Sequence, residues 1–222
     1  MQYIGYMKTH TSIQAINRRT LSDQVYYSLR TAIISLELEP GQKIRDMDLA
    51  EQFNVSRTPI REALKRLENE GLIITKPGSV TQVSAINIEE VKQAFVVVAS
   101  LHGLAARLAA SHLTTNEFDL LETYNDELIA SIDRKNVFEA IQADDYFHGV
   151  FIKASKNMEI AKVLESLMPK LRRLEFKKFD SKQATNSVSE HKKIITACKE
   201  KDIQLVSRLV EENWLSLSDQ LI

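Results

Sequence analysis

The sequence is poor in the residues that form covalent cross-links and sharp turns. Its 222 residues include a single cysteine, Cys198, which excludes an internal disulfide and any CxxC zinc or redox motif and suits a reducing compartment. Only six glycines and four prolines are present, and three of each lie between Pro40 and Gly78. Turn signals are therefore concentrated in the N-terminal third of the chain.

The chain also lacks an excess of charge of either sign and a long hydrophobic run. Its formal net charge is −1, so a nucleic-acid partner can be argued only from a local concentration of basic residues. Residues 1–19 have no continuous apolar core of the kind found in signal peptides, and no later apolar run approaches the roughly 20 residues of a membrane span. We expect a cytoplasmic protein with no membrane partner.

What is present, 44% hydrophobic and 27% charged residues, is an ordinary globular composition with enough apolar material for two domains. Within the N-terminal third, a helical pattern runs from Leu21 towards Pro40-Gly41. A short helical segment, Asp46–Phe53, is followed by a turn at Asn54-Val55 and a second helical segment, Ser56–Glu70. This is the spacing of a helix-turn-helix.

Two short strands are predicted directly after the second helix. Leu72–Thr75 and Val80–Val83 flank a turn at residues 76–79, which is the pattern of a β-hairpin. A hairpin in this place would act as a wing over the adjacent DNA groove. The N-terminal third is therefore predicted to be a winged helix-turn-helix.

The second helix of the motif has an apolar face beside a basic one. Projected at about 100° per residue, the apolar sector holds Ile60, Ala63, Leu64 and Leu67. The neighbouring sector holds Arg57, Thr58, Arg61 and Lys65, and Ser56 opens the helix where unpaired backbone N–H groups favour phosphate. A lone basic stripe is usually a solvated face. The preceding turn, the capping serine and the following hairpin favour DNA binding instead, with arginine reading guanine in the major groove.

From Asn87 to Ile222 the apolar residues recur at helical spacing, which predicts an all-α bundle. Helix starts are indicated by Thr114 with Glu117, by Asn136 with Glu139, and by Asp202. Pro169 predicts a kink or break, and the polar stretch 180–189 predicts a loop. The basic pair Arg172-Arg173 is interpreted as surface-exposed. The expected fold is thus mainly α, with an N-terminal arm (1–20), a winged helix-turn-helix (21–84) and a helical domain (87–222).

Three segments of the N-terminal third resemble the DNA-binding domain of the GntR superfamily: Asp48–Glu51 (DLAE), Val55–Leu64 (VSRTPIREAL) and Arg66–Leu72 (RLENEGL). The resemblance implies that Arg57, Thr58 and Arg61 carry the DNA contacts and that wing residues near Gly78 reach the minor groove. Two positions depart from the family: Met47 stands where some members have an arginine, and Val80 stands at the usual wing glycine.

The helical half resembles the FCD-type effector domain of the FadR-like subgroup. The resemblance rests on Leu101–Ala110 (LHGLAARLAA), Asp144–His148 (DDYFH) and Ser189–Ala197 (SEHKKIITA). It implies an effector-binding and dimerisation domain that commonly holds zinc, nickel or a similar divalent ion through one aspartate and three histidines, and often a small carboxylate beside it.

The FCD resemblance implies three metal ligands, Asp144, His148 and His191, with zinc, nickel or manganese as candidate ions. Asp144 and His148 lie four residues apart on a helix and so point the same way, although such a pair alone is more often a surface pair. The third histidine position holds Asn213, a poor zinc ligand. His102 could supply the missing imidazole, or it could be a helix histidine bonded to a neighbour. A further departure is Val98, which replaces the subgroup's carboxylate-binding arginine.

Together these features predict a ligand-responsive transcription regulator, in this family usually a repressor, that binds a short palindromic operator in double-stranded DNA as a homodimer. Its effector would be a small molecule, with an organic acid as one candidate. The alternative is a metal-dependent enzyme in which Asp144, His148 and His191 hold the ion and Glu190 acts as base. No recognisable nucleophile motif or phosphate loop supports that alternative.

Overall fold

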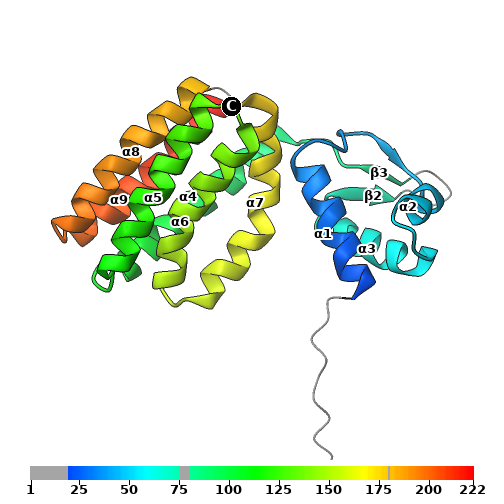
Figure 1. The fold of residues 1–222 in the computed structure, drawn as a ribbon, viewed down its shortest axis with the longest axis horizontal. Helices are drawn as coiled ribbons and strands as arrows, with labels where there is room; N and C mark the ends of the chain where they lie inside the picture. Colours follow the sequence, from blue (N-terminus) through cyan, green and yellow to red (C-terminus); the bar gives the residue numbers. More distant parts are fainter. Residues whose placement is uncertain (1–19, 76–80, 180) are drawn as a thin grey trace, which may run out of the picture.

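The structure, a computed structural model of the chain, describes residues 20–75, 81–179 and 181–222. Residues 1–19 of the predicted arm, Gly78 and Val80 of the predicted wing, and Asp180 lie outside these ranges. Figure 1 shows a small N-terminal lobe beside a larger helical bundle, with a short extended segment at residues 84–87 between them. The predicted fold class, a winged helix-turn-helix followed by an all-α bundle, is confirmed.

The N-terminal lobe contains three helices and a three-stranded sheet among its described residues. In chain order its elements are α1 (Leu21–Ile34), β1 (Lys43–Ile44), α2 (Asp46–Gln52), α3 (Arg57–Asn69), β2 (Ile73–Thr75) and β3 (Thr81–Val83). The sheet is antiparallel with the order β1-β3-β2, and Ile73 pairs with Val83. The hairpin prediction is confirmed, whereas β1 was not predicted because two residues are too few to show a period of two.

The helix-turn-helix turn forms as its sequence indicates. Asn54 adopts a left-handed conformation (φ 51°), which asparagine tolerates better than most residues, and the Val55 N–H donates to the carbonyl of Ala50 at 3.0 Å. The first helix is shorter than its apolar pattern suggested, since α1 ends at Ile34 and Leu36 has a φ of 63°. The apolar pattern extends beyond the helix because Leu38, in the loop that follows, also packs on the lobe's core.

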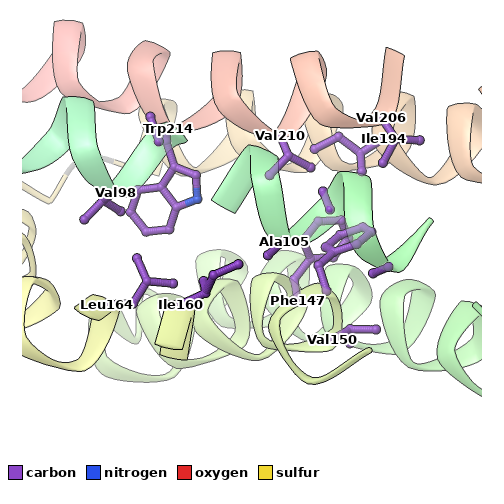
Figure 2. Packing of buried hydrophobic residues seen from close by; sticks show 14 of the residues in the cluster. Val98, Ala105, Phe147, Val150, Ile160, Leu164, Ile194, Val206, Val210 and Trp214 are labelled. Carbon is purple, nitrogen blue, oxygen red and sulfur yellow. The ribbon is translucent and has the colours of Figure 1, made fainter. Parts of the chain in front are cut away.

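The bundle consists of six described helices around one large apolar core and a smaller, separate apolar cluster. They are α4 (Ile88–Ala109), α5 (Thr115–Asp133), α6 (Val137–Ala154), α7 (Met158–Lys178), α8 (Ser181–Lys199) and α9 (Ile203–Leu221). Helix α4 runs through the centre and contacts α6, α7 and α9. Figure 2 shows the apolar layer that results, with Val98 and Ala105 of α4, Phe147 of α6 and Trp214 of α9.

Helix α4 is also, among the described helices, the one long and apolar enough to cross a membrane by length and composition. Half of its most apolar window is buried inside the bundle. Its hydropathy therefore matches its central position in the protein core.

The predicted helix starts are confirmed by side-chain caps. Thr114 and Glu117 form a reciprocal capping box, Asn136 accepts from the N–H of Glu139 at 3.2 Å, and Asp202 accepts from the N–H of Leu205 at 3.0 Å. Each cap satisfies backbone donors that the first helical turn leaves unpaired. The boundaries of α5, α6 and α9 are thus fixed by local chemistry.

Two sequence predictions in the bundle are wrong or only partly correct. The stretch predicted as a loop at 180–189 forms the start of α8 from Ser181 onward. Its serines and threonine cost a helix only a few tenths of a kcal/mol each, and the packing of α8 against α5 and α9 outweighs that cost. Pro169 does not break its helix, because α7 continues on both sides of it.

Candidate functional site

The basic face predicted for the second helix of the motif is present on α3. Ile60, Ala63 and Leu67 are buried in the lobe's core. The five described residues predicted to contact DNA are all exposed on one region of the surface: Ser56, Arg57, Thr58, Arg61 and Lys65. Ser56 is the N-cap residue of α3 by position and makes no side-chain cap bond, so its hydroxyl can still donate to a ligand.

Asp46, at the start of α2, joins the two arginines of this face and was missed by the sequence analysis. Its carboxylate accepts from Arg57 Nη2 at 2.8 Å and from Arg61 Nε at 2.7 Å. These two bonds hold the pKa of Asp46 below its usual range, with the Arg61 bond contributing most. Asp46 therefore orders the two side chains over one face while leaving them 48% and 63% exposed.

The residues predicted as metal ligands converge inside the bundle. Asp144 and His148 of α6 and His191 of α8 each offer a ligand atom, and these atoms lie within 4.8 Å of one another. Both histidines are buried, and the side chain of Asp144 is 13% exposed. One carboxylate and two imidazoles are a ligand set that suits zinc and related divalent ions.

The hydrogen bonds around His191 favour ligation through one particular nitrogen. Its Nδ1 lies 3.2 Å from the amide oxygen of Asn125, which can only accept, so Nδ1 carries the proton. Nε2 then presents a lone pair 3.5 Å from Asp144 Oδ1. Such an outer partner fixes the tautomer and orientation of a metal-binding imidazole. No sequence pattern pointed to Asn125, which lies 66 residues from His191 along the chain.

The unpartnered nitrogens of the buried histidines fit a cation. Both ring nitrogens of His148 and the Nε2 of His191 are buried without a hydrogen-bond partner in the described part of the chain. Burial lowers the pKa of His148 to about 3, so the ring is neutral and able to ligate at neutral pH. An unsatisfied buried nitrogen costs free energy that a bound ion would recover.

The two candidates for a fourth ligand are both close to this group but differ in their contacts. Asn213 donates its amide to Glu190 Oε2 at 2.6 Å. His102 stacks on Trp214 at 4.6 Å between ring centroids and lies 5.2 Å from the ring of His148. Its two nitrogens bond no neighbour among the described residues, and burial lowers its pKa well below the usual value.

Arg172 and Arg173, interpreted from sequence as surface residues, are each only 4% exposed. The Arg172 guanidinium contacts the carboxylates of Asp145 and Glu175 and lies 3.6 Å from Asp144 Oδ2. The exposure prediction failed because Arg172 meets Asp145 of α6 and Glu175 on the next turn of α7, while Arg173 donates to Ser84. Burial raises the pKa of Asp144 to about 6 and that of Glu175 to about 7, although Arg172 opposes both shifts.

Two family profiles match the chain, one for each lobe. Residues 21–83 match the family described as bacterial regulatory proteins, gntR family, and residues 93–214 match the FCD domain. The helix-turn-helix with its hairpin lies within the first match, and all the candidate metal ligands lie within the second.

Curated relatives are similar over most of the chain. The HTH-type transcriptional repressor RspR of Escherichia coli strain K12 is 25% identical over 202 residues, which is 90% of this chain and 89% of that protein. The Nta operon transcriptional regulator of Aminobacter aminovorans is 30% identical over 63% of this chain and 66% of its own length.

Solved structures share the fold. Escherichia coli McbR/YncC superposes with a TM-score of 0.80 at 20% identity, covering 91% of this chain and 97% of the other. A putative GntR regulator from Rhodococcus sp. RHA1 gives a TM-score of 0.77 at 16% identity, covering 90% and 96%.

Proposed function

The chain belongs to the GntR family of bacterial transcription regulators and carries an FCD domain, and from this premise we propose that it is a homodimeric repressor released from its operator by a small molecule. Its relatives are transcription regulators and not enzymes, so the alternative of a metal-dependent enzyme with Glu190 as base is not supported. We further propose that residues 21–84 act as the DNA-binding unit and 87–222 as the sensing unit, in the cytoplasm.

The observation that carries DNA binding is the exposed pair Arg57 and Arg61 on α3. Both guanidinium groups are ordered by Asp46, yet their pairs with it are exposed, and such pairs contribute only about 0–1 kcal/mol. The two arginines can therefore leave Asp46 for a guanine or a phosphate with little loss of free energy. Ser56, Thr58 and Lys65 would contact the backbone beside them, with Gly78 of the wing at the minor groove.

A homodimer is supported by an apolar stripe along α4. Val97, Leu101, Leu104 and Leu108 lie on one side of the helix, and Val97 and Leu108 are 46% and 40% exposed. Pairing of this stripe with its copy would bury it and would set two recognition helices on two half-sites of a palindrome. In sedimentation of the full chain, Leu108→Glu should yield monomer, whereas Val163→Glu on the exposed side of α7 should not.

The sensing unit would hold a zinc, nickel or manganese ion through Asp144, His148 and His191. An ion bound there would tie α6 to α8 and satisfy nitrogens that otherwise lack partners. Elemental analysis after incubation with each ion tests this assignment. His191→Ala should abolish binding, and the variants His102→Ala and Asn213→Ala decide between the two residues as fourth ligand. A wild-type protein that stays metal-free with all three ions would contradict the assignment.

Helix α7 supplies the connection between sensing and DNA binding. Arg172 contacts the carboxylates around the metal site, while the next residue, Arg173, donates to the hydroxyl of Ser84 at 2.9 Å in the segment between the lobes. One further contact joins the same helix to the N-terminal lobe, since Arg30 of α1 donates to the Glu165 carbonyl at 3.2 Å. Lys170 also pairs with Glu90 at 3.1 Å in the first turn of α4, next to the segment between the lobes. A ligand that favours one arrangement of α7 would shift the population of lobe orientations.

The experiment that tests the function is a salt titration of binding to the DNA upstream of the chain's own gene. Specific binding should be tighter than to a scrambled duplex by at least about 10³-fold, with a linear fall of log K against log salt. Equal affinity for both duplexes at physiological salt would contradict a regulator that reads sequence.

A further inference from the structure

A small cavity lies at one end of the bundle, where the last turns of α7 and α9 meet the first turns of α6 and α8. Its volume is about 40 Å³, enough for a few water molecules or a short side-chain-sized group. Most of its lining is apolar, contributed in part by Leu128, Ile141, Phe179 and Leu217. The cavity also reaches two carboxylates, those of Asp144 and Glu175.

Glu175 lines this cavity and has one oxygen without a hydrogen-bond partner among the described residues. Its side chain is 6% exposed, and one carboxylate oxygen, Oε2, is bonded by Arg172. The other, Oε1, is buried and has no hydrogen-bond partner among the residues that the structure describes. An unmet buried acceptor is costly, more so when it is charged, and a donor placed in the cavity would remove that cost.

The charges around the cavity disfavour an anionic ligand. No lysine or arginine is among its described lining residues. Arg172 is already shared by Asp144, Asp145 and Glu175. A divalent ion at the metal site would offset the carboxylates that Arg172 leaves uncompensated, which brings the region to neutrality rather than to a positive charge.

We propose that this cavity binds a small alkylammonium compound, whose ammonium group donates to Glu175 Oε1 while its alkyl chain contacts the apolar wall. This inference rests on the proposed function, in which the bundle senses a small molecule, and it specifies the chemical class of that effector as an amine rather than an organic acid. A cationic donor suits the Glu175 carboxylate, which is ionised above its pKa of about 7, because charge-assisted hydrogen bonds are the stronger ones. The size of the cavity favours a short unbranched chain.

Three probes of equal chain length separate charge from shape. The full-length protein, metal-free and zinc-loaded, is titrated with n-butylammonium chloride, sodium butyrate and n-butanol, and binding is followed by ligand-observed NMR. Butylammonium should bind at least about tenfold more tightly than butyrate in both forms, a difference of about 1.4 kcal/mol. Butanol should lie between them because it donates without charge.

Substitutions at the cavity then test the contact. Glu175→Gln keeps the size of the side chain and removes its charge, and it should lower butylammonium affinity at least about tenfold. Glu212→Gln changes an exposed carboxylate on α9 that pairs with Arg208, so it is the matched control and should leave butylammonium affinity unchanged. Ala184→Phe fills the cavity from α8 while leaving both carboxylates in the sequence, and it should abolish binding of all three probes. This second variant covers the case in which Glu175→Gln fails to fold.

Equal affinity for butyrate and butylammonium, or unchanged butylammonium affinity in Glu175→Gln, would overturn the proposal. Operator affinity, measured separately in the absence of any amine, keeps this result distinct from the proposed function. A protein that binds DNA but no amine would refute the cavity assignment alone. A protein that binds the amine but no DNA would refute the regulator and leave the cavity assignment standing.

Discussion

Both lobes pair arginine with carboxylate, but the pairs are exposed to solvent in the N-terminal lobe and buried in the bundle. Arg61 on α3 is 63% exposed beside Asp46, whereas Arg172 on α7 is 5% exposed between Asp145 and Glu175. Water and salt weaken the first pair, so its arginine can change partners readily. The second arginine is buried away from water, so its charge is stabilised by its carboxylate partners instead. The exposed Arg61 is therefore available to bind DNA, whereas the buried Arg172 stabilises the bundle.

The largest effect should come from removing the buried charge. Arg172→Ala leaves Asp144, Asp145 and Glu175 without their shared cation and should lower the free energy of unfolding by about 3–5 kcal/mol. Urea denaturation measures the change. Arg208→Ala removes an exposed arginine of α9 that pairs with Glu212, and it should change stability by less than about 1 kcal/mol. Similar losses in the two variants would contradict the contrast between the lobes.

The exposed arginines should show the converse behaviour. Arg57→Ala and Arg61→Ala should each weaken operator binding by about 1–3 kcal/mol, because each would remove the base contact proposed for that arginine. The melting temperature should stay within a few degrees of wild type, since both side chains lie outside the apolar core. Fluorescence anisotropy with operator DNA checks the first expectation and calorimetry the second. Wild-type operator affinity in either variant would rule out this face as the reader of sequence.

Burial also gives the metal site a distinctive pH dependence. His148 has a pKa of about 3 and stays neutral over the working range, whereas the pKa of Asp144 is raised to about 6. Below that value the Asp144 carboxyl is protonated and an ion must displace the proton. Zinc affinity should thus be constant above about pH 6 and fall about tenfold per pH unit below it, a slope of one proton, or about 1.4 kcal/mol per unit. A steeper fall that begins near the ordinary histidine pKa would indicate solvated histidines.

The smallest stability effect is expected at Asp46. Asp46→Ala breaks two exposed ion pairs and should change the free energy of unfolding by less than about 1 kcal/mol. It also releases Arg57 and Arg61 from their ordered positions and removes a negative charge from the DNA-facing surface. The ratio of operator affinity to scrambled-duplex affinity should therefore fall, with non-specific binding tightened. An unchanged ratio would mean that Asp46 does not position the arginines.

The sequence predicted what depends on neighbours along the chain. The recognition helix, its turn at Asn54 and the caps at Thr114 and Asp202 are local patterns, and each appears in the structure. The convergence of Asp144, His148 and His191 was predicted from family resemblance, because α6 and α8 are separated by a whole helix.

The missed features depend on contacts between distant segments. Asp46 meets Arg57 and Arg61 only once α2 and α3 have packed, and Asn125 meets His191 only once α5 and α8, which are two helices apart in the sequence, lie side by side. Arg172 is buried because carboxylates of α6 and α7 surround it. The residue pattern within α7 does not indicate those carboxylate partners, and a basic pair considered alone is normally exposed.

The contact between Arg30 and the Glu165 carbonyl bears on how the two lobes could be exchanged between regulators. That carbonyl lacks its usual helical partner because residue 169 is proline, which has no N–H to donate. The acceptor is thus created by the backbone, and any residue could stand at 165 without removing it. Arg30 in turn bonds Glu70 at 2.9 Å, the residue that ends the recognition helix. A chimaera that joins this DNA-binding lobe to another helical domain would need a proline at the matching turn to receive Arg30, and sequence identity at the lobe boundary would not reveal whether it is there.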